Sequence, residues 1–206
     1  MELLHREEIE RRLGSSGGQA LHIEPLLELS QIGEVTIDLR LGTEFLVSIL
    51  TRKAYISVHK SDQDYRGISS YFRPTRRELG DRFILFPNQI VLASTIEYLG
   101  LPDDVYADVL SRSSYTRLGV DVNTMVQPGF RGCLSVELFN HGNTPVELVV
   151  GSRVFQARLF SVGRETLYNS GPNRRKYFGA VRPAVSRAPD DSDLIKLEAI
   201  RERRSS

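Results

Sequence analysis

The sequence has little of what several large protein classes require. Its 206 residues include no tryptophan, a single cysteine, Cys133, and only four histidines. One cysteine cannot form an internal bridge, so a disulfide-stapled secreted scaffold is excluded. No apolar run reaches the roughly 18 residues of a membrane-spanning helix, and the acidic start MELLHREEIE lacks a signal-peptide core. We therefore expect a cytoplasmic protein with no membrane partner.

Charge of one sign is not in excess either. The chain has 27 Lys and Arg against 26 Asp and Glu, a formal net charge of +1. No global field therefore attracts nucleic acid, and we expect no nucleic-acid partner. The length suits one domain with small extensions and is sufficient to bury a real core.

The motifs of the common catalytic and cofactor sites are missing as well. Zinc nucleobase deaminases need a His/Cys/Cys cluster with H-x-E and P-C-x-x-C spacing. The histidines here are scattered, so we expect surface or turn histidines and no zinc site; they are His5, His22, His59 and His141. Neither a P-loop nor a G-x-G-x-x-G fingerprint occurs, and no G-x-S-x-G elbow surrounds Ser113 or Ser114.

The sequence does contain many short β-rich runs punctuated by Gly, Pro and Asn between about residues 35 and 160. Such runs predict an all-β sandwich or barrel. The predicted strands are Ile37–Leu41, Phe45–Ile49, Phe83–Phe86, Gln89–Ser94, Val105–Leu110, Gly132–Phe139, Pro145–Val150 and Val154–Phe160.

Short helices are predicted at both ends of the chain. Apolar residues among charges predict an amphipathic helix at 3–13, which the glycine-rich stretch 14–18 ends. Residues 190–206 are predicted to form a charged helical tail, with acidic residues first and arginines last. Residues 52–80 are polar and irregular, as in a long excursion.

Groups suited to phosphate binding gather in one short stretch. Arg112 and Arg117 flank Ser113 and Ser114. Guanidinium forks and hydroxyls are what a triphosphate requires, although the two arginines taken alone also fit the pattern of ordinary surface arginines.

Glu137 follows this stretch in a predicted strand. Alternation sends Leu134, Val136 and Leu138 to one face and Ser135, Glu137 and Phe139 to the other. If the first face is the core, the carboxylate is either solvated or faces a cleft or a neighbouring subunit. In such a cleft it is a candidate for water activation.

The segment 164–187 is locally basic. It holds six cations and one acid, Glu165, a local charge of 6 − 1 = +5, together with Tyr168, Tyr177 and Phe178. A flexible basic segment with aromatics suits closure over nucleotide phosphates. A solvated charge run fits the same composition.

Five motifs, in order, resemble those of the dCTP deaminases, which form a superfamily with the trimeric dUTPases. Ile37–Gly42 is similar to the D-L-R-L-G strand, and Pro87–Pro102 to the "P…A-x-T-x-E…L-P" hairpin. Arg112–Gly119 matches R-S-S-x-x-R-L-G, and Pro128–Glu137 resembles P-G-[WF]-x-G-x-x-x-x-E. Lys176–Arg187 resembles the closing K-Y-x-G…S-R segment.

The resemblance implies a distorted jelly-roll of the dUTPase-like β-clip type, built from residues 1–189 and assembled as a homotrimer with sites between subunits. It implies a deoxynucleoside triphosphate ligand, dCTP or dUTP, with Mg²⁺ on the phosphates and no protein-bound metal. The implied activity is zinc-independent hydrolytic deamination of dCTP to dUTP and ammonia.

The same resemblance implies roles for individual residues. Glu137 activates water for attack on C4 of cytosine and passes the proton to the leaving ammonia, while Arg117 and Ser113 orient the water and polarise the site. The implied phosphate and tail contacts are Arg112, Ser113, Ser114, Tyr168, Lys176 and Tyr177. The remaining substrate-binding candidates are Asn123, Thr124, Gln127, Ser135 and Val136.

The chain also departs from the family pattern around the base site. Gln127 replaces an aspartate, Val120–Val126 is about three residues shorter and lacks a histidine, and Ala180 replaces a tail glutamine. Because dUTP diphosphatases need that aspartate and carry a hydrophobic residue at the position of Glu137, diphosphatase and bifunctional activity are both disfavoured.

Three functional hypotheses therefore stand. The first is dCTP deamination. The second is a dUTP diphosphatase, or a deaminase of a different or modified deoxynucleoside triphosphate. The third is a non-catalytic nucleotide-binding regulatory trimer. Asn123 and Thr124 are candidates to hydrogen-bond the pyrimidine edge.

Overall fold

A computed structural model describes residues 1–60, 65–166 and 177–205. The chain divides into two compact units. The first comprises Met1–Val47 and Pro74–Ala184, and the second comprises Ser48–Arg73 and Val185–Ser206.

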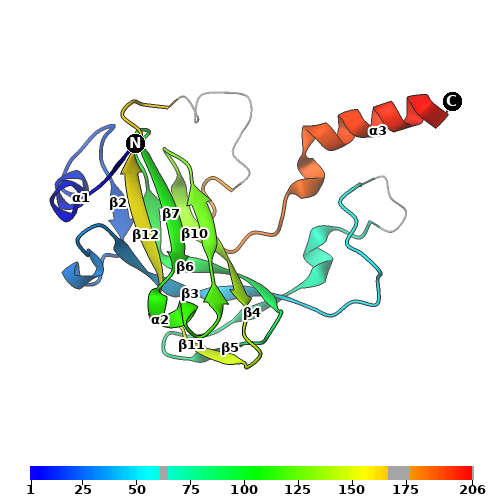
Figure 1. Ribbon diagram of the computed structural model, residues 1–206, viewed down its shortest axis with the longest axis horizontal. Helices are drawn as coiled ribbons and strands as arrows, with labels where there is room; N and C mark the ends of the chain where they lie inside the picture. The colour runs from blue at the N-terminus through cyan, green and yellow to red at the C-terminus, as the bar shows by residue number, and fades with distance from the viewer. Residues whose placement is uncertain (61–64, 167–176, 206) are drawn as a thin grey trace. The chain divides into compact units, whose positions relative to one another are not determined.

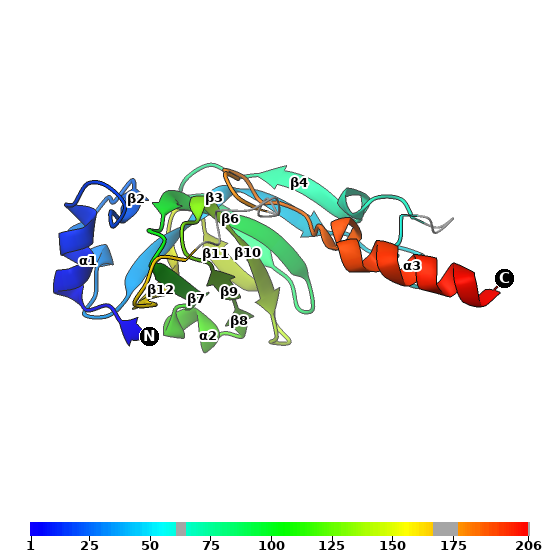
Figure 2. The ribbon, with the colours of Figure 1, turned by 90° about the horizontal axis from the view of Figure 1, so that it is seen from above.

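An antiparallel sheet of ten strands dominates the first unit (Figures 1 and 2). Its main path runs β8-β10-β6-β3-β12-β7-β9, and three further strands pair with this path: β1 with β12, β2 with β6, and β4 with β3. The strands of the path are β3 (Ile37–Ser48), β6 (Ile90–Gly100), β7 (Val105–Ser111), β8 (Val120–Asp121), β9 (Asn123–Val126), β10 (Arg131–Asn140) and β12 (Arg153–Ser161). The others are β1 (Glu2–Leu3), β2 (His22–Glu24) and β4 (Phe72–Arg76).

The two ends of this path lie next to each other in the sequence. Only Val122 separates β8, at one end, from β9, at the other, and its side chain is buried. The chain therefore steps from one end of the sheet to the other within one residue, and the sheet is nearly closed. The predicted all-β fold is confirmed.

Two sequence predictions about strands need correction. The predicted Ile37–Leu41 and Phe45–Ile49 are not separate strands: both fall in β3, which ends at Ser48 and has a register shift between Leu41 and Phe45. Gly42 lies at the shift, where an added Cβ would meet the Ser94 carbonyl oxygen at 2.6 Å. The segment 87–102 is not a hairpin, because β6 pairs with β10, β3 and β2 as one long strand.

A second, two-stranded sheet pairs β5 (Arg82–Leu85) with β11 (Val146–Val149). It is joined to the large sheet through aromatic stacking: the rings of Phe45 and Phe83 lie 4.1 Å apart at 11°. Both side chains belong to the buried core. Burial of a phenylalanine side chain contributes about 1.5–3 kcal/mol, so this contact fixes the small sheet on β3.

The N-terminal helix α1 spans Arg6–Leu13, later than the predicted 3–13, because Glu2–Leu3 form β1 against β12. It lies beside β2 in both views (Figures 1 and 2). Ile9 buries its apolar side chain, and Arg12 extends inward to Asp104, with nitrogen–oxygen distances of 2.9 and 2.8 Å.

The second unit contains the 3-10 turn η2 (Ile68–Tyr71), the turn η4 (Ala188–Asp190) and the helix α3 (Ser192–Ser205). Lys60 pairs with Asp190 at 2.6 Å. A helix is therefore present in the predicted tail, and the excursion 52–80 is partly ordered by η2 and β4. Within the described ranges, no helix is both long and apolar enough to cross a membrane.

Candidate functional site

The Arg112-Ser113-Ser114 motif forms the turn that follows β7. Arg112 is extended (φ −62°, ψ 145°), and its N–H donates to the Val154 carbonyl at 2.9 Å. Ser113–Thr116 then make the single helical turn α2, which leaves Ser113, Ser114 and Arg117 exposed. The motif thus presents two hydroxyls and two guanidinium groups on one short element.

Arg112 and Ser114 line a groove of about 620 Å³. The rest of the wall comes from β3, α2 and the start of β12. The other lining residues are Arg40, Tyr115, Leu118, Ser152 and Arg153. Three arginines and several hydroxyls along one groove form a binding surface for an anion with many oxygens.

Carboxylates pair with the arginines of the groove. Asp38 lies 3.3 Å from Nε of Arg112 and 3.9 Å from Arg153, and it also accepts from Gln156 at 3.2 Å. Glu28 pairs with Arg40 at 3.0 Å and with Arg153 at 2.5 Å. These contacts fix the orientation of the guanidinium groups.

Glu137 occupies the face of β10 that alternation predicts. Leu134, Val136 and Leu138 are buried, whereas the Glu137 side chain is exposed. The hydroxyl of Thr124, on β9, donates to its Oε2 at 3.0 Å. The structure therefore joins two of the predicted site residues directly and leaves the carboxylate open to solvent.

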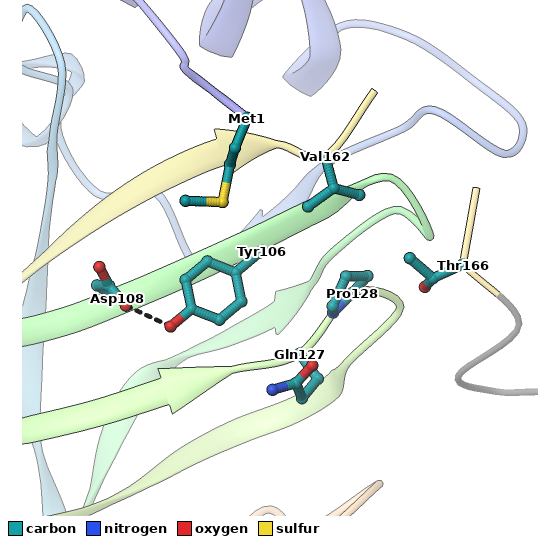
Figure 3. A pocket seen from close by; sticks show the side chains of 7 residues that line it. All are labelled: Met1, Tyr106, Asp108, Gln127, Pro128, Val162 and Thr166. Atoms are coloured by element: carbon teal, nitrogen blue, oxygen red, sulfur yellow. Dashed lines mark hydrogen bonds between the residues drawn. The ribbon is translucent and has the colours of Figure 1, made fainter. Parts of the chain in front are cut away.

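Gln127 lies in a different place, a pocket of about 360 Å³ (Figure 3). Its neighbours there include Pro128, Tyr106 and Asp108. The Tyr106 hydroxyl donates to Asp108 at 2.5 Å, and burial, together with this hydrogen bond, raises the pKa of Tyr106 to about 12. Glu137 lines neither this pocket nor the groove.

Ser135 contacts the tail of the same chain. Its Oγ accepts the Ala184 N–H at 3.2 Å, and the Gly179 N–H donates to the Arg131 carbonyl at 2.7 Å. Gly132 has φ +147°, and a Cβ there would lie 2.6 Å from the Ala180 carbonyl oxygen. The segment 179–184 therefore contacts the part of β10 that directly precedes Glu137.

The other predicted site residues are dispersed. Asn123 is exposed on β9, opposite Leu110, and Tyr177 is exposed in the tail. The side chain of Val136 is fully buried in the core, so only its main chain is available to a ligand. Tyr168 and Lys176 lie outside the described residues.

Sequence reasoning missed Arg40 and Arg153 as part of the groove. Arg40 was visible within the D-L-R-L-G motif, but only as a member of a strand pattern. Arg153 follows the Gly151 turn and carries no local signal. Their proximity results from strand pairing, since they are Cα partners in the β3–β12 ladder.

Among residues 1–60, 65–166 and 177–205, no group of three or more His, Cys, Asp and Glu is placed to hold a metal ion. The acidic residues beside the groove are already paired with arginines.

Comparison with known proteins decides the family. The family described as dCTP deaminase-like matches residues 3–162. The chain belongs to this family. A dUMP-forming dCTP deaminase from Methanobrevibacter smithii is 37% identical over 179 residues, which cover 84% of this chain and 90% of that protein. A dCTP deaminase from Natronomonas pharaonis is 34% identical over 198 residues, covering 93% and 97%.

This dCTP deaminase-like chain also shares its fold with a solved structure. The crystal structure of 2′-deoxycytidine 5′-triphosphate deaminase from Agrobacterium tumefaciens superimposes with a TM-score of 0.57 at 22% identity. The match covers 77% of this chain but only 48% of that one, so the chain spans about half the length of that structure.

Proposed function

We propose that this dCTP deaminase-like protein hydrolyses the exocyclic amine of dCTP, giving dUTP and ammonia. The observation that carries the proposal is the exposed Glu137 carboxylate, held by Thr124 on the sheet that also bears the arginine groove. A carboxylate near a bound pyrimidine can take a proton from water, and its fixed neighbour keeps it oriented.

The proposed reaction uses residues of this chain throughout. The groove formed with Arg112 and Ser114 binds the triphosphate, and Mg²⁺ enters as part of that substrate. Glu137 accepts a proton from water as the water oxygen bonds to C4, and this proton passes to N3 of the ring. The remaining hydroxyl proton then moves through the same carboxylate to the amine, the C4–N bond breaks to release ammonia, and the C4 carbonyl forms. Ser113, the first residue of α2, and Arg117, which directly follows α2, are both exposed and polarise the reacting groups.

We further propose a homotrimer with sites between subunits. Two observations support it: Glu137 lines neither the arginine groove nor the Gln127 pocket, and its side chain is exposed. An adjacent subunit would place a groove opposite this carboxylate and shield it from bulk solvent, leaving room for the reacting water. Sedimentation equilibrium would measure three chain masses; a monomer at micromolar concentration with full activity would contradict the assembly.

The test of the activity is ammonia release from dCTP. Glu137→Gln keeps the shape of the side chain and its hydrogen bond from Thr124 but cannot accept a proton, so turnover should fall by at least about a thousandfold, within the range general-base removal gives. Glu147→Gln, on the exposed face of β11, is the matched control and should retain activity. Retained turnover in Glu137→Gln would remove the mechanism.

A second candidate is formation of dUMP, because the Methanobrevibacter smithii relative carries that name. The dUTP diphosphatases that the sequence resembles carry an aspartate for attack on the α-phosphate where this chain has Gln127, an amide that cannot act as a general base. We therefore expect dUTP to accumulate without pyrophosphate. Pyrophosphate equal to ammonia would establish the dUMP-forming reaction, and tight dCTP binding without either product would establish a regulatory protein.

Base recognition is proposed to involve Asn123, which is exposed on β9 directly before Thr124 in sequence. Asn123→Ala should reduce discrimination between dCTP and dTTP in competition binding. Unchanged discrimination would remove Asn123 from the recognition surface.

Arg117 is proposed to act on the reacting groups more than on binding. Arg117→Ala should then lower kcat much more than it raises KM, and Arg117→Lys should restore only part, since a point charge does not replace a planar fork. Equal losses in binding and turnover would make Arg117 a phosphate clamp instead.

A further inference from the structure

Two arginines of the groove stand directly opposite each other on neighbouring strands. Arg40 on β3 and Arg153 on β12 are Cα partners in the antiparallel ladder, and both line the groove. Like charges at such positions destabilise a sheet, because the side chains lie side by side and repel. The fold must therefore supply a counter-charge that keeps both guanidinium groups in place.

Glu28 is the carboxylate that pairs with both arginines, whereas Asp38 lies near Arg153 alone of the two, at 3.9 Å. One carboxylate oxygen of Glu28 lies 3.0 Å from Nη2 of Arg40 and the other 2.5 Å from Nη2 of Arg153. Arg153 also donates to the hydroxyl and carbonyl of Ser30, at 2.7 and 3.2 Å. Glu28 is not among the residues that line the groove, and the side chains of Arg40 and Arg153 remain 13% and 18% exposed.

The turn that carries Glu28 is itself fixed from the core. Gln31 ends this 3-10 turn, η1 (Leu29–Gln31), and is 1% exposed. Its amide nitrogen donates to Glu97 at 3.0 Å and to the Asp38 carbonyl at 3.1 Å, and its oxygen accepts the Glu28 N–H at 3.3 Å. Glu97 is 0% exposed and accepts the Arg40 N–H at 2.9 Å. A continuous set of hydrogen bonds thus joins the core, the turn and β3.

We propose that Glu28 is a positioning residue for the triphosphate: by bridging Arg40 and Arg153 it holds the pair ready for the phosphate chain. A guanidinium fork that is already oriented loses less side-chain freedom when it binds, which favours affinity. The inference rests on the proposed function in taking the ligand to be a nucleoside triphosphate. It adds a residue that binds no substrate atom.

Calorimetric titration with dCTP, dCDP and dCMP tests the role, because the effect must grow with the number of phosphates. Glu28→Gln keeps the size of the side chain but removes the shared charge. We expect the Kd for dCTP to rise about tenfold and the Kd for dCMP to change less than twofold. In turnover, KM for dCTP should rise by the same factor, with kcat within twofold.

Each contrary result would overturn the proposal. Equal losses for all three nucleotides would indicate a general structural role, a fall in kcat alone would indicate a role in chemistry, and tighter dCTP binding would show that Glu28 opposes the phosphates. Glu34→Gln, at an exposed glutamate six residues further on, is the matched control and should bind all three nucleotides as the parent chain does.

A double-mutant cycle guards against an indirect effect. If Glu28 acts through Arg153, then Glu28→Gln should cost clearly less in dCTP affinity when Arg153→Gln is already present. Additive losses would contradict the link. Binding is measured without turnover, so a chain that binds dCTP but releases no ammonia would remove the proposed deamination and leave this test intact. Absence of dCTP binding by the parent chain would end both.

Discussion

Replacement of Arg12 should destabilise the protein strongly, because this arginine joins α1 to the loop between β6 and β7 through a largely buried ion pair. Its side chain is 6% exposed and makes a two-pronged contact with Asp104, at 2.9 and 2.8 Å. Nε also donates to Glu8 at 2.7 Å. The hydrogen bond to Asp104 is the main cause of a raised Arg12 pKa, so the arginine stays charged at any working pH.

The loss of stability in Arg12→Met can be estimated from the carboxylate that the substitution leaves unpaired. Arg12→Met keeps a long apolar stem but leaves Asp104 without its cation while still largely buried. Removing one partner of a buried pair costs about 3–5 kcal/mol. Because Asp104 keeps some solvent contact and Met restores apolar packing, we expect a loss of about 3 kcal/mol. For a chain of this length, this corresponds to a fall of about 6–12 °C in Tm.

Urea denaturation at a fixed protein concentration measures the loss, since guanidinium salt would screen the pair. The double variant Arg12→Met, Asp104→Leu removes both charges and should recover to within about 1 kcal/mol of the parent chain. If the double variant is as unstable as Arg12→Met, the loss does not come from an uncompensated carboxylate. A single-variant loss below about 1 kcal/mol would refute the reasoning outright.

Three further perturbations have defined outcomes. The hydrogen bond from Arg11 is the main cause that lowers the Glu8 pKa from 4.5 to about 2. The ionised Glu8 therefore stabilises the fold above pH 4.5, and this contribution is lost as the pH falls towards 2. In Glu8→Gln, the midpoint of urea unfolding should depend less on pH across that window. Thr124→Val removes the 3.0 Å bond to Glu137 and should lower kcat about tenfold, or about 1.4 kcal/mol, whereas Thr124→Ser should retain turnover. Gly132→Ala places a Cβ 2.6 Å from the Ala180 carbonyl oxygen and forces alanine into a backbone with φ of +147°. The segment around Ala180 should then detach more readily from β10, so limited proteolysis should cleave it faster. An unchanged cleavage rate would show that its attachment does not depend on the close contact with Gly132.

The face on which Glu137 lies could be predicted because strand alternation is local. Leu134, Val136 and Leu138 occupy alternate positions of β10 and identify the face that packs on the core. The Glu137 carboxylate must then lie on the opposite face. The Arg112–Arg117 turn was equally readable, since its hydroxyls and guanidinium groups are contiguous in sequence. Both predictions need no knowledge of pairing.

The groove could not be predicted in the same way, because it depends on register. Arg40 and Arg153 are more than a hundred residues apart in sequence and meet only because β3 pairs with β12. A shift of one residue in that ladder would move either side chain to the other face. Glu28 is harder still, since its turn carries a capping pattern that indicates local structure and not a partner.

The short 120–126 segment limits the role that Thr124 can have. With only Val122 between β8 and β9, the chain passes directly from one end of the sheet to the other and brings Thr124 onto Glu137. A threonine hydroxyl has one proton to donate, and here the Glu137 carboxylate accepts it. Thr124 therefore cannot also donate to a pyrimidine acceptor without releasing the carboxylate. The shortened segment therefore assigns this hydroxyl to orientation of the proposed base.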